Sequence, residues 1–166
     1  MYLYFPDRDT IMRELCDQAF NLLVASFKAI AAEKRAPLDT LRGLMEAYVR
    51  FGLDHPTEYN LVFMLKQAMP DDAIHCTSPL SEVPGTLGAQ AFAAIRSVVT
   101  HLVENNVFIQ DNPTKLAELI WMAGHGMVML LITLPHFPWT EREELIRSGI
   151  DMPLKGLLSP TAQERL

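Results

Sequence analysis

Apolar residues recur at spacings of three and four along most of this 166-residue chain. That spacing places them on one face of an α-helix, so the chain is predicted to be a set of helices that each bury one face. The stretch that begins at Ile11 is the clearest case, and Asp7 is a suitable N-cap for it. The predicted helices cover residues 8–33, 37–54, 58–67, 88–106, 113–134 and 141–149.

Prolines and polar caps set several of these limits. His55 precedes Pro56, and a residue before proline avoids the helical region, so the second helix should end there. The Asn-Pro pair at 112–113 is typical of a cap followed by a first-turn proline. Thr140 and Glu143 have the spacing of a capping box, which predicts the start of the last helix.

Two stretches interrupt the helical pattern. Residues 69–88 contain three prolines and two glycines, and they are predicted to be mainly loop. Gly149 and Pro153 should end or bend the last helix, with a further turn after them. Because no alternating apolar and polar run of useful length is found, the predicted fold class is all-α.

The composition is that of a packed chain without a basic surface. Hydrophobic residues make up 49% of the sequence, which is enough to fill a sizeable core. The net charge is −6, whereas proteins that bind nucleic acid present Lys and Arg to the phosphates. We therefore expect this chain, as given, to bind duplex DNA no better than an inert acidic protein.

Candidate chemical sites are weak. Cys16 and Cys76 form neither a CxxC pair nor a disulfide framework, which fits a reducing cytoplasm, and the first six residues do not resemble a signal peptide. His75 lies beside Cys76, but no second ligand pair follows at zinc spacing, and no GxSxG motif is present. We expect a cytoplasmic protein that is not an enzyme, with no catalytic residues, metal or cofactor.

The run 119–134 is apolar on more than one face. It is shorter than a membrane span and is interrupted by Gly124, His125 and Gly126. We interpret it as a central helix, with one face packed on its own domain and another on a second subunit. His125 is either a satisfied core histidine or a polar contact in a ligand pocket, and His125-Gly126 is a candidate for close helix packing.

The first eleven residues, MYLYFPDRDTI, resemble the segment that ends the recognition helix and begins the next helix in TetR-family repressors. The positions that match this pattern in order are Tyr2, Tyr4, Phe5, Arg8, Asp9 and Ile11. In the family, the residues that correspond to Tyr2 and Arg8 commonly touch DNA phosphates, which position the protein without reading bases. The alternative is that these residues are simply a hydrophobic start of the chain.

Two later motifs strengthen the resemblance. Residues 48–59 and 61–64 look like the regulatory domain of the branch that carries a Trp…His-Gly signature. Residues 121–126, WMAGHG, match that signature. Two separate motifs in the right order are a stronger indication than either motif alone.

The resemblance implies a TetR-like C-terminal regulatory domain of about six helices that dimerises through a four-helix bundle. Residues 1–12 would be the remnant of a helix-turn-helix domain, and residues 13–166 the ligand-binding and dimerisation domain. Because the base-reading helices precede Met1 in the family, this chain lacks base-reading side chains, and operator DNA would be bound only by a full-length parent. The implied function is ligand-responsive control of transcription, normally repression.

The resemblance also implies two sets of site residues. A small apolar or aromatic effector would bind in a pocket formed by Tyr48, Phe51, Phe63, Met64, Phe92, Trp121, Met122 and His125. A homodimer interface would be formed by Val128, Leu131, Leu145 and Ile146. The alternative function is a stand-alone helical dimer that binds a small molecule or a protein and does not bind DNA.

Overall fold

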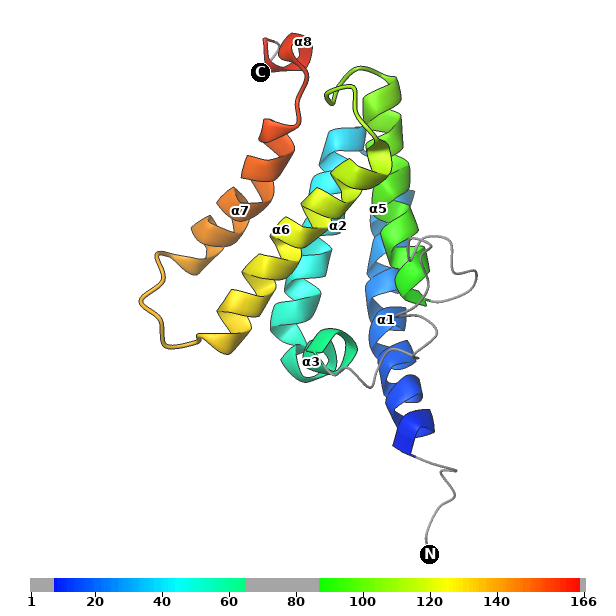
Figure 1. Cartoon of the computed structure of the whole chain (residues 1–166), viewed down its shortest axis with the longest axis vertical. Helices are drawn as coiled ribbons and strands as arrows, with labels where there is room; N and C mark the ends of the chain where they lie inside the picture. Colours follow the sequence, from blue (N-terminus) through cyan, green and yellow to red (C-terminus); the bar gives the residue numbers. More distant parts are fainter. Residues whose placement is uncertain (1–7, 65–86, 165–166) are drawn as a thin grey trace, which may run out of the picture.

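The computed structural model describes residues 8–64 and 87–164. These residues form helices α1 (Arg8–Ala32), α2 (Pro37–Asp54), α3 (Pro56–Met64), α5 (Leu87–Glu104), α6 (Pro113–Thr133), α7 (Arg142–Gly156) and α8 (Pro160–Gln163), as Figure 1 shows. Within the described ranges the only β structure is an isolated bridge between Phe108 and Leu158. The predicted all-α fold class is confirmed.

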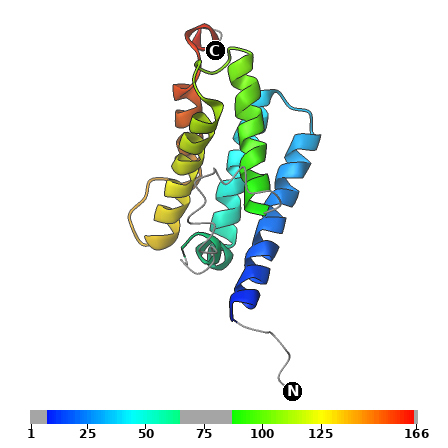
Figure 2. The same cartoon turned by 45° about the vertical axis from the view of Figure 1, so that its right-hand side comes forward.

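Helix α2 is the centre of the bundle. It packs against α1, α3, α5, α6 and α7. In Figure 1, α1 and α5 lie on one side of α2 and α7 lies on the other, and Figure 2 shows α1 beside α5 from a second direction. Helix α2 is therefore in direct contact with every other long helix of the domain, so a displacement of α2 would affect each of them.

Sequence periodicity explains why α2 occupies this position. Its buried apolar residues recur at short helical spacings and share one broad face of the helix, and they are Leu41, Leu44, Met45, Tyr48, Val49 and Phe51. Each fully buried aliphatic or aromatic side chain stabilises the fold by about 1.5–3 kcal/mol relative to an exposed one. The same continuous core includes buried residues of α1, α3, α5, α6 and α7.

Most predicted helix limits agree with the structure. Helix α2 begins at Pro37 and ends at Asp54, with His55 as its C-cap. Helix α3 begins at Pro56, two residues before the predicted start, because a proline is accepted in a first helical turn. The Asn112 side chain accepts a 2.9 Å hydrogen bond from the Thr114 N–H, which is the predicted cap of α6.

Helix α7 differs from its prediction at both ends. Its N-cap is Glu141, whose carboxylate accepts from two backbone N–H groups, and not Thr140. The helix continues to Gly156 with Pro153 inside it. Buried apolar residues recur every four positions on both sides of this proline, and their burial offsets the hydrogen bond that proline removes. These residues are Ile146, Ile150 and Leu154.

Several predictions fall outside the described residues. They are the Asp7 cap, the contact expected of Tyr2, the end of the third helix at residue 67 and the loop predicted over most of 69–88. Arg8 begins α1, but its side chain is not among those described. Helix α1 is continuous across residues 12 and 13. The predicted domain boundary between these two residues therefore lies within one helix.

Candidate functional site

Three helices bring four polar aromatic side chains together, which we call the Tyr-His cluster. Its members are Tyr48 of α2, Tyr59 of α3, and Trp121 and His125 of α6. The two tyrosine hydroxyls lie 2.9 Å apart, and Nδ1 of His125 lies 2.6 Å from the Tyr59 hydroxyl and 3.1 Å from the Tyr48 hydroxyl. The Trp121 indole N–H donates to the Tyr48 hydroxyl over 3.0 Å.

Two phenylalanines extend the cluster. The ring of Phe63 lies 4.7 Å from that of Tyr59 and 5.1 Å from that of His125, measured between centroids. The rings of Phe92 and Trp121 meet edge to face at 6.0 Å. Such geometries are favourable beyond simple burial. The site is therefore a largely apolar aromatic region that contains one connected set of hydrogen bonds.

Glycine allows α6 to approach α2 at this point. A Cβ at Gly124 would lie 2.6 Å from the Met45 methyl group and 3.6 Å from the Tyr48 ring. Trp121 and His125 flank Gly124 on the same face of α6, so the close approach brings both against Tyr48. A Cβ at Gly126 would meet nothing within 4 Å. The predicted close packing is thus made by Gly124, and not by Gly126.

A second glycine accommodates α6 from the side of α2. A Cβ at Gly52 would lie 2.4 Å from a Val128 methyl group and 2.9 Å from the Tyr59 ring. Real Cβ atoms do not approach other atoms so closely, and neither neighbour is a flexible chain end. Because it has no side chain, Gly52 leaves room for both Val128 and Tyr59. It lies one turn along α2 from Tyr48.

Burial keeps the cluster uncharged. It raises the pKa of the Tyr48 hydroxyl to about 12 and also raises the pKa of Tyr59. Burial lowers the pKa of His125, which favours the neutral imidazole. The cluster can donate and accept hydrogen bonds near neutral pH without carrying a charge.

Most of the predicted pocket residues lie in this region. Tyr48, Trp121 and His125 belong to the cluster, Phe63 and Phe92 pack on it, and Phe51 lies beside Tyr59. Met122 is corrected: it is 63% exposed and points to the solvent side of α6 instead of into the cluster. The Met64 side chain is outside those described.

Tyr59 was not among the predicted pocket residues, although it is fully buried and contacts both Tyr48 and His125. A usable signal was present. Tyr59 stands four positions before Phe63, and residues at this spacing share one helix face. The choice of Phe63 as a pocket residue could therefore have indicated Tyr59 as well.

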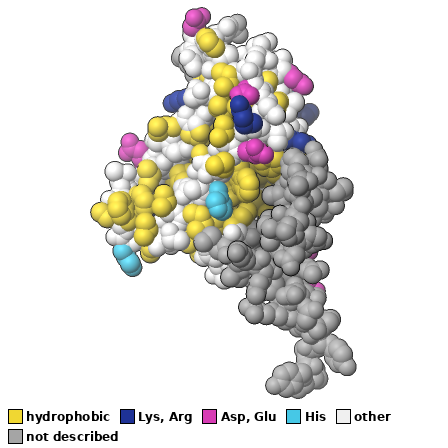
Figure 3. Space-filling model, in the orientation of Figure 1, with side chains coloured by type: hydrophobic (Ala, Val, Ile, Leu, Met, Phe, Trp, Pro, Cys, Tyr) yellow, Lys and Arg dark blue, Asp and Glu magenta, His cyan; other side chains and the backbone are white. Residues whose placement is uncertain are grey.

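The exposed side of α6 carries an apolar stripe, which we call the α6 outer face. It consists of Leu119, Met122, Ala123, Gly126 and Leu130, all of them exposed. Their spacing of three and four places them on one side of the helix, away from Trp121 and Val128. Figure 3 shows hydrophobic side chains gathered where α6 and the loop after it lie.

Three of the predicted dimer residues are corrected. Val128 is 0% exposed and lies against Gly52, while Leu131 and Ile146 are also buried within the chain. Side chains already covered in this way leave little or no surface for a partner. Leu145 is partly exposed. The apolar surface that α6 does expose is its outer face, and the homodimer itself stays a prediction.

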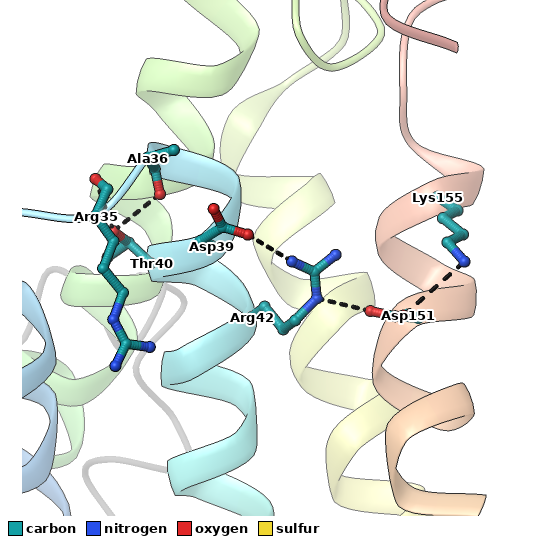
Figure 4. A network of polar contacts seen from close by, with 7 residues as sticks. All are labelled: Arg35, Ala36, Asp39, Thr40, Arg42, Asp151 and Lys155. Carbon is teal, nitrogen blue, oxygen red and sulfur yellow. Dashed lines mark hydrogen bonds and ion pairs between the residues drawn. The ribbon is translucent and has the colours of Figure 1, made fainter. Parts of the chain in front are cut away.

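Ion pairs connect α2 to α7. Arg42 lies between Asp39 of its own helix and Asp151 of α7, at 2.7 and 2.8 Å, as Figure 4 shows. Eight residues further along α2, Arg50 pairs with Glu143 of α7. A hollow of about 110 Å³ lies between these two pairs, and its apolar lining residues are Ile146 and Ile150.

A second hollow lies at the start of α2. It has a volume of about 450 Å³, opens to solvent and is lined by residues that include Arg35, Asp39 and Glu46. Both hollows have charged rims, unlike the apolar cavity expected beside Trp121. That cavity stays a prediction.

Helix α6 has 21 residues and is apolar enough, by length and composition only, to cross a membrane. The run 119–134, which was judged too short for a span, is only part of the apolar segment, because the helix begins six residues earlier at Pro113. Of its most apolar window, 33% is buried within the chain, and α6 packs against α2, α5 and α7. A core helix of a soluble protein passes the same test, so the feature is weak evidence for a membrane span.

The described residues contain no group of three or more His, Cys, Asp or Glu side chains placed to hold a metal ion. All buried side-chain nitrogen and oxygen atoms among them have hydrogen-bond partners. The hydrogen bonds of the Tyr-His cluster are therefore part of a satisfied core as well as a candidate site.

Comparisons with known proteins agree with this architecture. A protein of unknown function from Rhodococcus sp. RHA1 has a similar structure, with a TM-score of 0.73, 18% identity, and coverage of 95% of this chain and 77% of the other. The TetR family transcriptional regulator PfmR from Thermus thermophilus has a TM-score of 0.61 and 21% identity, covering 91% and 77%. None of the curated proteins matches the chain.

The family comparison is more specific than the structural likenesses, which at these identities show the fold alone. The model described as "Tetracyclin repressor-like, C-terminal domain" matches residues 41–152, which is more than half of the chain and includes Tyr48, Tyr59, Trp121 and His125. The chain belongs to the family of tetracycline-repressor-like C-terminal domains.

Proposed function

We propose that this chain is the effector-binding and dimerisation part of a ligand-responsive transcriptional regulator, normally a repressor. The observation that carries the proposal is the Tyr-His cluster, which joins α2, α3 and α6 within a domain of the TetR type. Small-molecule sites combine apolar and aromatic walls with a few placed polar groups, and the cluster has this composition. Family membership points to a regulator rather than an enzyme.

The effector would act through the helices that carry the cluster. A small apolar or aromatic molecule bound beside Trp121 and Phe63 would shift α2 and α3. Both of these helices pack on α1. In the proposed parent protein α1 follows the reading head, residues 1–12 belong to that head, and operator binding requires two heads at a fixed spacing. A shift of α1 would change this spacing and weaken the binding of both half-sites.

The homodimer would form through the α6 outer face, with residues of α7 at its edge. An exposed apolar stripe of this length on a helix is unusual in a soluble monomer. Pairing the stripe with a second copy across a two-fold axis would cover it in both subunits. Leu134 and Phe137, the exposed apolar residues that follow the stripe in the chain, would extend the covered area.

Tryptophan fluorescence gives a direct test of effector binding. The chain has two tryptophans, and Trp139→Phe leaves Trp121 as the only one. Hydrophobic aromatic compounds that raise the melting temperature should also change Trp121 emission, because a molecule that binds only the folded form stabilises it. A library of such compounds that stabilises the protein without any change in Trp121 emission would contradict the location of the site.

The second candidate is a stand-alone helical dimer that binds a small molecule or a protein and has no role on DNA. The net charge of −6 favours it for the chain as given. The two candidates predict different coding sequences upstream of the gene segment that encodes this chain. An in-frame upstream sequence that predicts two short helices with a glycine-containing turn would support the regulator. The chain alone should give no sequence-specific gel shift at physiological salt, and a shift that survives moderate salt would contradict this expectation.

A further inference from the structure

The hydrogen bonds of the Tyr-His cluster determine where the protons are. Four contacts join its polar atoms: Trp121 to Tyr48, Tyr48 to Tyr59, Tyr59 to His125, and Tyr48 to His125. The indole N–H can only donate, so the Tyr48 oxygen accepts at this end. The protons that remain are those of the two hydroxyls and one on the neutral imidazole.

Only one histidine tautomer gives both buried hydroxyl protons an acceptor within the cluster. If Nδ1 of His125 carried the proton, it would donate to a tyrosine oxygen, and one of the two hydroxyl protons would be left without an acceptor within the cluster. If Nδ1 is unprotonated, Tyr48 donates to Tyr59, and Tyr59 donates to Nδ1 over the shortest contact, 2.6 Å. The proton of the imidazole is then on Nε2.

This arrangement leaves one donor of the cluster available. Tyr48 and Tyr59 are buried, whereas His125 is partly exposed. Among the described residues none forms a hydrogen bond with Nε2 of His125, while Nδ1 is bonded to both tyrosines. The Nε2–H group therefore stands at the edge of an aromatic surface, with its direction fixed by the buried hydroxyls behind it.

Resting on the function proposed above, we propose that the effector is an uncharged molecule with an aromatic or apolar body and an acceptor oxygen, such as a carbonyl, that accepts from Nε2–H of His125. The rings of Phe63 and Trp121 beside the imidazole suit the apolar body. None of the four side chains of the cluster or the two phenylalanines beside it carries a full charge. A carboxylate bound there would therefore lose its water without gaining a compensating cation.

The tautomer is measured directly by ¹⁵N NMR of the imidazole in the full chain at pH 7.5. The expected spectrum is that of a neutral histidine protonated on Nε2. The double variant Tyr48→Phe/Tyr59→Phe removes both hydroxyls within reach of Nδ1 and should increase the population of the other tautomer. A His125 protonated mainly on Nδ1 in the native protein would overturn the proposal, whatever the protein binds.

Matched probes test the ligand class. The probes are 2-acetylnaphthalene, 2-isopropenylnaphthalene, which has the same shape but lacks the oxygen, and 2-naphthoate, with affinities measured by calorimetry. The ketone should bind about 3- to 10-fold more tightly than the alkene, which is the range expected of one hydrogen bond, and naphthoate should bind no better than the alkene.

The variant His125→Phe should remove the preference for the ketone, so that the ketone and the alkene bind with equal affinity. Equal binding of ketone and alkene to the native protein would overturn the acceptor proposal but leave the effector site intact. Tightest binding of naphthoate would overturn the uncharged class. Failure of all three probes to bind would count against both this inference and the proposed function.

Discussion

At the scale of single residues, the hydroxyl of Tyr59 is the group on which the cluster depends most. It bonds to both Tyr48 and His125 in a fully buried position. Tyr59→Phe should lower the free energy of unfolding by about 1–3 kcal/mol, because it leaves buried polar partners unpaired. Chemical denaturation measures the change. In a double-mutant cycle with His125→Gln, the two effects should not add, and strict additivity would contradict the coupling.

The neutral state of His125 predicts a pH dependence. Because burial lowers its pKa in the folded protein, the unfolded chain binds more protons between that lowered pKa and the ordinary value near 6.5. The free energy of unfolding should therefore fall as the pH decreases below about 6.5. His125→Gln should flatten this part of the profile, whereas the exposed His136→Gln should leave it unchanged. The profile is measured by denaturation at a series of pH values.

At the scale of elements, the contact between α2 and α6 depends on Gly52. Gly52→Ala should lower the free energy of unfolding by about 1–3 kcal/mol, since its methyl group would overlap Val128 and Tyr59. Gly156→Ala is the matched control, because a Cβ there meets nothing within 4 Å and alanine favours a helix. Thermal unfolding of both variants gives the comparison. Equal effects would show that the α2–α6 approach is not close.

Helix α7 should be held mainly by its apolar stripe and not by its ion pairs. Arg42 and Asp151 are both partly exposed, and exposed pairs contribute up to about 1 kcal/mol. Ile150 is buried, and its truncation to alanine typically costs about 2–5 kcal/mol. Denaturation should therefore find Ile150→Ala much more destabilising than Arg42→Met, with only the latter effect decreasing at high salt. The opposite order would contradict this account of α7.

The helices were predictable where a local signal exists. Pro37, Pro56 and Pro113 each stand at the start of a helix, and Asn112 caps one as expected. Helix α7 was predicted too short, because Gly149 and Pro153 are local signals for an end that tertiary packing overrides. Local propensity describes a helix in isolation, and the core decides how far it continues.

At the scale of the whole molecule, the prediction failed where it required the orientation of a helix. Family motifs led to Tyr48, Trp121 and His125, which do lie together. A helix that is apolar on every side gives no indication of which side faces its own core, so Met122 was placed inside and Val128 outside. The packing of α6 on Gly52 and Tyr48 determines the orientation, and that contact joins residues distant in sequence.

The assembly is the property on which the regulator proposal depends most, since two reading heads on one operator require two subunits. Leu130 on the α6 outer face is 49% exposed, so Leu130→Asp should yield a folded monomer. Val128→Asp should instead prevent folding, because a charge would be buried within the chain. Gln18→Asp, at an exposed position of α1, is the control that should leave the assembly unchanged.

Sedimentation equilibrium of the native chain at micromolar concentration tests this account most directly. The account predicts a mass of twice the 18.7 kDa of one chain, and a mass of one chain for Leu130→Asp with its helical circular dichroism retained. A native chain that sediments as a stable monomer of 18.7 kDa would contradict it.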